Sequence, residues 1–210
     1  MILGIRFPAA LLPIIGALFG LCGGLCILVL PKGPGAVAAV TLWTAGTLAA
    51  GERGLARWFT KLPLFGSLIG GVTILVRWYA LISLHSPSNR MLCSVTASLA
   101  IAQAATVALA WVSRPADDAA VKRLAPLTTN AAVIAMALGA LALWPFPMPV
   151  PVVLGLAAYL SVRLVSWYAA WRFGGVRASD LEAHRVILET ACLALLASLL
   201  TGHATPASYH

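Results

Sequence analysis

The sequence predicts an all-α, polytopic helical membrane protein with about seven transmembrane helices. Of the 210 residues, 61% are hydrophobic and only 10% are charged, whereas soluble domains carry about 25% charged residues. Apolar stretches of the length that a ~30 Å hydrocarbon core requires recur along the chain. The charged residues gather in the short segments between these stretches. Residues 1–210 are therefore predicted to form a single integral membrane domain.

The predicted spans should be helical, because backbone groups in lipid must find their hydrogen-bond partners within the segment. They cover residues 8–30, 34–50, 62–84, 91–113, 126–146, 149–171 and 186–202. The second and seventh are shorter than the ~20 residues of an ordinary crossing, so each is expected to be either re-entrant or tilted. Between the fifth and sixth spans, the proline-rich "WPFPMPVPVV" is typical of a tight hairpin.

Lys and Arg are distributed unevenly between the two sides of this predicted domain. Ten of the fourteen fall in loops on the side of the N-terminus, two on the other side and two within spans. Because cytoplasmic loops are enriched in Lys and Arg, the N-terminus is predicted to be cytoplasmic and the C-terminus external, in the cell inner membrane. The net charge of +8 thus indicates orientation in a lipid bilayer, and no basic and aromatic cluster suggests nucleic acid as a partner.

Three charged residues, Arg77, Arg163 and Glu189, fall inside predicted spans, where an unpaired charge costs at least ~2.5–3.5 kcal/mol at the bilayer centre. Glu189 is expected either to pair with Arg185, one helical turn earlier, or to be a metal- or phosphate-site carboxylate in a cavity open to the cytoplasm. The two arginines either snorkel toward headgroups or face a polyanionic substrate from the interior. Arg163 lies deep in its span, which favours the interior position.

The segment "RFGGVRASDLEAHR" before the last span has the features of a helix start. Gly174 and Gly175 allow a left-handed backbone or a close approach, and Ser179 to Glu182 fits a capping box with the helix beginning at Asp180. A helix N-terminus after glycines is also a phosphate site, provided that a divalent cation bridges its acids. His184 is expected to be solvated in this loop.

The order of these pieces resembles the cobalamin synthase family of adenosylcobinamide-GDP ribazoletransferases. "LLPIIGALFG" is similar to that family's first span, and Arg77 to a basic residue of its third span. "LAAGERGLARWFTK" occupies the place of its aspartate-rich motif, with Arg53, Arg57 and Thr60 at the aspartate positions. "GGVRASDLEAHRVILE" resembles its closing motif, in which Glu189 matches directly.

The resemblance implies an enzyme of cobalamin biosynthesis, a transferase that joins α-ribazole to adenosylcobinamide-GDP with release of GMP and uses Mg²⁺. It assigns no catalytic residue. Its candidate residues for the substrate phosphates are Arg53, Arg57, Arg77, Gly174 and Gly175, and its candidate magnesium ligands are Glu52, Asp180, Glu182 and Glu189. The alternative is a catalytically degenerate relative that binds a corrinoid or nucleotide, or that supports a membrane partner subunit or a second copy of the chain. Arginines at aspartate positions favour this alternative, because they repel Mg²⁺ by several kcal/mol at an effective dielectric constant of about 20.

Overall fold

The computed structural model describes residues 9–29, 35, 37–46, 63–84, 88–116 and 127–202, and this part of the chain is all-α. Its elements are a 3-10 turn η1 (Ala9–Leu11) and the helices α1 (Leu12–Val29), α3 (Pro63–Leu84), α4 (Ser88–Val112), α6 (Thr129–Leu141), α7 (Pro149–Phe173) and α8 (Ala178–Gly202). A further short apolar helix covers Val37–Gly46. The predicted all-α fold class is thus confirmed.

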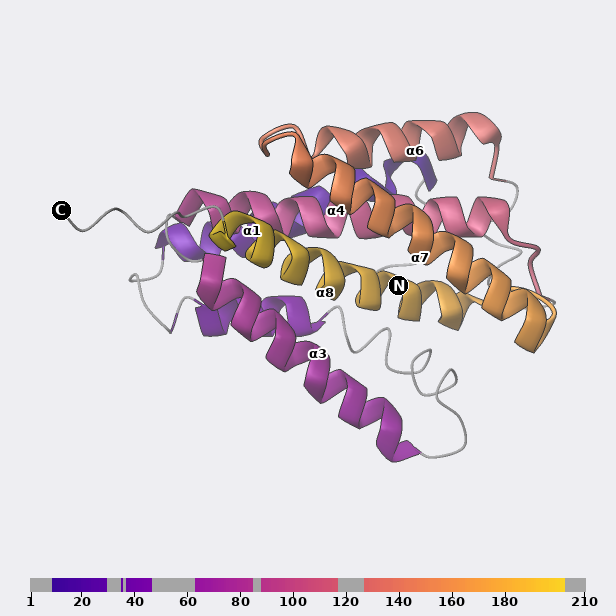
Figure 1. The fold of residues 1–210 in the computed structure, drawn as a ribbon, viewed down its shortest axis with the longest axis horizontal. Helices are drawn as coiled ribbons and strands as arrows, with labels where there is room; N and C mark the ends of the chain where they lie inside the picture. The colour runs from indigo at the N-terminus through magenta and orange to yellow at the C-terminus, as the bar shows by residue number, and fades with distance from the viewer. Residues whose placement is uncertain are drawn as a thin grey trace.

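Helix α4 lies at the centre of the bundle, and α1, α6, α7 and α8 pack around it (Figure 1). Helix α3 packs mainly on α8 and extends away from the rest of the bundle along its lower edge in this view. Most of α4 is buried, whereas only a small part of α7 is. The residues of α4 that face its neighbours are mainly small, which lets several helices approach the same central helix closely.

Helices α1 and α4 approach each other closely. Gly16, Gly20 and Gly24 repeat at every fourth residue of α1, so they share one face that is turned toward α4. A Cβ atom added at Gly20 would lie 2.7 Å from the Cα atom of Thr96 and would meet backbone rather than a movable side chain. Small residues at this spacing allow helix backbones to touch, as in helix pairs within membranes.

Helices α4, α7 and α8 are each long and apolar enough to cross a membrane. The other four predicted spans correspond to shorter apolar helices within the described residues, at Ala9–Leu25, Val37–Gly46, Leu68–Leu84 and Thr129–Leu141. The outer surface is strongly apolar: large side chains of α7 such as Leu156, Leu164 and Trp167 are more than half exposed. An exposed apolar surface of this extent is typical of contact with lipid or another protein.

The connection between α6 and α7 was predicted correctly, and the start of α8 was not. The proline-rich hairpin is confirmed, because a turn over residues 142–148 joins α6 to α7. The start of the last helix was predicted too late: α8 begins at Ala178, before the expected Asp180 and before the predicted span 186–202. The low hydropathy of this polar first turn predicted a loop, but the Asp180 carboxylate has a hydrogen-bond partner inside the protein, the backbone N–H of Arg177.

Gly20→Ala is expected to lower the free energy of unfolding by about 1–3 kcal/mol, because the added methyl group overpacks a contact between two backbones. Gly155→Ala is the matched control, since a Cβ atom at this exposed position of α7 has nothing within 4 Å. Unfolding in detergent micelles, followed by circular dichroism, would measure both variants. Equal stability of the two would contradict the close packing of α1 on α4.

Candidate functional site

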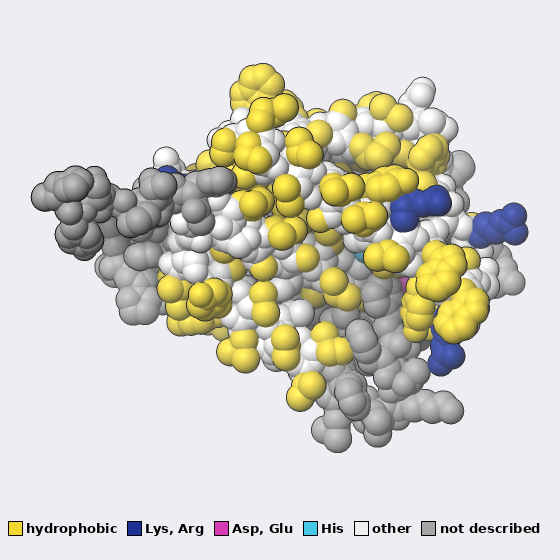
Figure 2. All heavy atoms as spheres, viewed as in Figure 1, with side chains coloured by type: hydrophobic (Ala, Val, Ile, Leu, Met, Phe, Trp, Pro, Cys, Tyr) yellow, Lys and Arg dark blue, Asp and Glu magenta, His cyan; other side chains and the backbone are white. Residues whose placement is uncertain are grey.

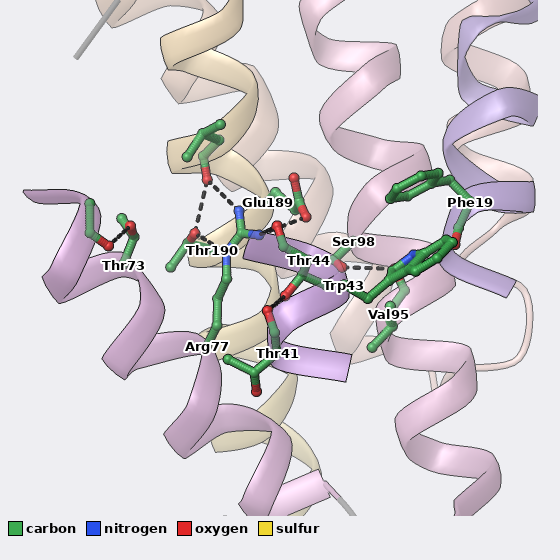
Figure 3. Close-up of polar contacts among 12 residues, drawn as sticks. Phe19, Thr41, Trp43, Thr44, Thr73, Arg77, Val95, Ser98, Glu189 and Thr190 are labelled. Carbon is green, nitrogen blue, oxygen red and sulfur yellow. Dashed lines mark hydrogen bonds and ion pairs between the residues drawn. The ribbon is translucent and has the colours of Figure 1, made fainter. Parts of the chain in front are cut away.

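The candidate site is a buried ion pair between α3 and α8 (Figure 3). Nη1 of Arg77 lies 3.0 Å from Oε1 of Glu189, and both side chains are 0% exposed. The arginine also donates to the Thr190 hydroxyl through Nε at 2.8 Å, to the carbonyl of Thr44 through Nη1 at 2.8 Å and to the carbonyl of Val186 through Nη2 at 3.3 Å. The guanidinium is therefore surrounded by oxygen acceptors from two helical segments, α8 and Val37–Gly46.

Two threonines take part in this network. Thr44 lies in the helix Val37–Gly46, and its carbonyl accepts from Nη1 of Arg77 at 2.8 Å. The Thr190 hydroxyl accepts from Arg77 and donates to the carbonyl of Val186 at 2.9 Å, so it satisfies the charge and its own helix together. The carbonyl of Val186 is thus shared between Arg77 and Thr190.

This network offsets the cost of placing two charged side chains within apolar helices. Removing an ion from water costs several kcal/mol, and an ion pair offsets this only when further hydrogen bonds satisfy its remaining donors. Arg77 meets that condition, since its fork of five N–H donors faces Glu189, Thr190 and two carbonyls. Of the alternatives for Arg77, the interior position is therefore correct, and the group it faces is a carboxylate of its own chain.

The predicted magnesium ligands within the described residues are spread along α8. Asp180 is 1% exposed, and its Oδ2 accepts from the backbone N–H of Arg177 at 2.9 Å. Glu182 is half-buried in the first turns of α8. At 1.5 Å of rise per residue, Asp180 and Glu189 are roughly 13 Å apart along the axis. Within the described residues, no three His, Cys, Asp or Glu side chains come together as a metal site.

Asp180 performs the capping that was predicted for Ser179 and Glu182. The Arg177 carbonyl accepts from the N–H of Leu181, so Arg177 is the N-cap of α8 and Asp180 is the third residue of the helix. From that position a carboxylate reaches back to the N-cap N–H, which is one half of a capping box. The predicted motif was thus the right kind but displaced by two residues.

The two glycines before α8 adopt the two backbone features that the sequence predicted. Gly174 has a φ of 72° and forms the left-handed cap of α7. Gly175 permits a close approach, because a Cβ atom there would lie 2.7 Å from the carbonyl oxygen of Arg114. Their N–H groups donate to the carbonyls of Ala170 and Ala169, at 3.2 Å each, and so cap α7.

A short backbone pairing holds these glycines against the end of α4. Val176 donates to the carbonyl of Arg114 at 3.0 Å, and Ala116 donates to the carbonyl of Val176 at 3.1 Å. Pro115 and Val176 thereby form a parallel bridge. The C-terminal ends of α4 and α7 and the start of α8 therefore meet at one end of the bundle.

His184 and Arg163 lie where the sequence did not predict them. His184 was expected to be solvated, but it is 2% exposed on α8, and its Nε2 lies 3.0 Å from the Ser161 hydroxyl of α7. The helical register explains this, since His184 shares the buried face with Leu181 and Leu188. Arg163 was predicted to face the interior but is exposed on α7. Glu52, Arg53 and Arg57 lie outside the described residues.

Sequence reasoning did not identify the pairing of Arg77 with Glu189 or the roles of Thr44 and Thr190. A signal was present: two opposite charges inside apolar helices tend to pair with one another, because each alone is costly in lipid. The partner carbonyl of Thr44 carries no such signal, since every residue has one. The Ser161–His184 contact likewise depends on how α7 packs on α8.

These features define the class of the protein as a helical bundle with an apolar exterior, a buried inter-helix ion pair and three helices able to cross a membrane. Beyond that class, no family model, no curated protein and no solved structure matches the chain.

Arg77→Met alone should lower the free energy of unfolding by about 3–5 kcal/mol, because it leaves Glu189 buried without its cation. Adding Glu189→Leu should recover most of this loss, since an apolar pair needs no desolvation. Arg163→Met, at an exposed position of α7, is the control and should change little. Denaturant titration in micelles of the unaltered chain, Arg77→Met, Glu189→Leu, the double variant and the control gives the coupling energy. Simple additivity of the two single losses would be inconsistent with a direct pair.

Gly175→Ala should open the pairing between residues 114–116 and Val176, because the new methyl group meets backbone on the partner segment. Hydrogen exchange at the amides of Ala116 and Val176, which donate the two bridging bonds, is expected to accelerate by at least about tenfold, the factor for a loss of about 1.4 kcal/mol. The amide of Ala131, bonded to Thr128 at the start of α6, provides an internal reference. Unchanged exchange at both bridging amides would show that the segment tolerates a side chain.

Proposed function

We propose that this chain is a polytopic inner-membrane protein of the cobalamin synthase type that acts as a non-catalytic subunit. It would bind a corrinoid or nucleotide, or support a partner subunit in the membrane, without turnover. The observation that carries this proposal is the buried pair of Arg77 and Glu189, at 3.0 Å and fully enclosed. In this chain the glutamate that matches the family's closing motif is neutralised by an arginine.

The proposed arrangement in the membrane has seven crossings, with the N-terminus in the cytoplasm and the C-terminus outside. It is supported by the exposed Trp144 and Met148 before α7 and by Trp167 and Trp171 near its other end. About 20 residues of helix separate the two groups, or roughly 30 Å at 1.5 Å per residue. Aromatic side chains at this spacing are typical of the two interfaces of a bilayer.

The described charges support the same orientation. Arg114, Arg172 and Arg177 lie at the end of the bundle where α4 meets the turn between α7 and α8. Arg90 lies at the opposite end, where it lines a shallow pocket with residues of the α6–α7 turn and of the end of α8. An excess of arginine at one end favours the cytoplasmic side for that end.

A non-catalytic role is favoured by the chemistry of the missing site. Magnesium needs several oxygen ligands in near-octahedral geometry, whereas Asp180 caps its own helix and Glu189 pairs with Arg77. Arginines at two of the family's aspartate positions add positive charge where a cation would be needed. The transferase remains the second candidate, on the strength of the order of motifs that runs along most of the chain.

The purified chain in liposomes is expected to release no GMP from adenosylcobinamide-GDP, α-ribazole and Mg²⁺. An active member of the cobalamin synthase family, assayed in parallel, is the control. GMP release matched by an equal amount of corrinoid product would refute the non-catalytic proposal and support the transferase.

The binding role has its own measurement. Retention of adenosylcobinamide-GDP by the liposome-bound chain, without Mg²⁺, is expected to be saturable. The triple change Arg53→Asp, Arg57→Asp, Thr60→Asp separates the two candidates further, because it should weaken binding of the pyrophosphate to a binding subunit but restore Mg²⁺-dependent turnover to a decayed enzyme. Absence of retention would restrict the proposal to support of a partner subunit.

A further inference from the structure

Arg163 is an exposed cation on the apolar outer surface of α7. It lies ten residues before the end of the helix at Phe173, or roughly 15 Å along the axis. It makes no hydrogen bond or ion pair within the described part of the chain. A charge that faces hydrocarbon is costly unless it reaches the headgroups or meets an anion. This arginine therefore needs a counter-ion that the described part of its own chain does not supply.

Arg163 belongs to a continuous row of exposed side chains on one face of α7. The row, called here the α7 stripe, consists of Leu156, Leu160, Arg163, Trp167 and Trp171. Steps of three and four residues keep these side chains on the same face of the helix. The Trp167 and Trp171 rings are stacked, with centroids 6.2 Å apart and planes 6° from parallel. An apolar ridge thus leads to a cation and then to a flat aromatic pair.

The surroundings of the stripe are positive. On the face drawn in Figure 2, most Lys and Arg side chains gather at the right-hand end, where α7 ends, next to large apolar side chains. Arg172 and Arg114 are exposed at this end. The described acids of this region are not exposed competitors, because Asp180 is buried and bonded to the Arg177 N–H, and Glu182 is half-buried.

We propose that the α7 stripe binds an anionic phospholipid of the surrounding bilayer. The lipid phosphate would pair with the Arg163 guanidinium, which matches phosphate oxygens with two parallel N–H donors. One acyl chain would lie along Leu160 and Leu156, toward the middle of the membrane. Trp167 and Trp171, nearer the end of α7, would pack beside the polar headgroup in the interfacial region, where indole rings prefer to lie. This inference rests on the embedding of α7 in a membrane and is independent of any corrinoid ligand.

The test is native mass spectrometry of the full chain in a neutral detergent, with phosphatidylglycerol or phosphatidylcholine of equal chain length as the titrant. The intact protein is expected to retain phosphatidylglycerol more tightly than phosphatidylcholine. Arg163→Gln should weaken phosphatidylglycerol binding about fivefold, the factor for one arginine near an anionic surface. Arg163→Lys should retain much of the affinity, because a lysine still attracts phosphate as a point charge.

Two further variants assign the effect to the stripe. Arg90→Gln removes an exposed arginine at the opposite end of the bundle and should leave phosphatidylglycerol binding unchanged. Trp167→Leu should weaken it, since leucine keeps the apolar surface but removes the stacked indole. Equal affinity of Arg163→Gln and the unaltered chain for phosphatidylglycerol would overturn the proposal, as would equal retention of the two lipids by the unaltered chain. Thermal unfolding in lipid-free detergent checks that each variant is folded.

Discussion

The interaction on which the arrangement of α3 depends is the buried pair of Arg77 and Glu189. Helix α3 packs mainly on α8 (Figure 1), and its buried Leu81 and Leu84 add apolar contacts with the helix Val37–Gly46 and with α4. A buried arginine tolerates few alternative positions, because each of its N–H groups must keep an acceptor in a region without water. The carbonyl of Thr44 extends the same constraint to the helix Val37–Gly46. One guanidinium therefore fixes three segments that are far apart in the sequence.

Most other polar side chains of the interior, unlike Arg77, form their hydrogen bonds within their own helix. Hydroxyl groups of the bundle mostly donate to carbonyls of their own helix, as Thr41, Thr73 and Ser98 do. Such bonds satisfy a polar side chain without requiring a partner helix, which leaves small side chains free to bring backbones together. Many large apolar side chains are also exposed on α3 and α7, although others such as Leu81, Leu154 and Leu196 fill the core. An outer surface this rich in large apolar side chains suits a bundle whose surroundings are lipid.

The sequence was sufficient for features that depend on local chemistry. Long apolar runs predicted the helices, proline predicted the α6–α7 hairpin, and Gly174 and Gly175 adopt the left-handed cap and the close approach expected of them. The sequence was not sufficient where contacts between helices determine which side chains are buried and which are paired. Hydropathy placed His184 in a solvated loop, but the packing of α8 against α7 buries it beside Ser161. Glu189 was identified as the acid to explain, yet its partner lies 112 residues away on another helix, a separation that periodicity cannot detect.

Arg77 and Arg163 are both arginines within apolar helices, but one is buried and paired inside the protein and the other is exposed on its surface. Both were open to the same interpretations from the sequence, and the fold separates them. Arg77 is 0% exposed and finds its anion within the chain, so its charge is used to join helices. Arg163 is exposed among leucine and tryptophan side chains, so its charge is available to an external group. Because Glu189 is already engaged by Arg77, an anionic ligand of this protein is better sought at its exposed arginines than beside Glu189 on α8.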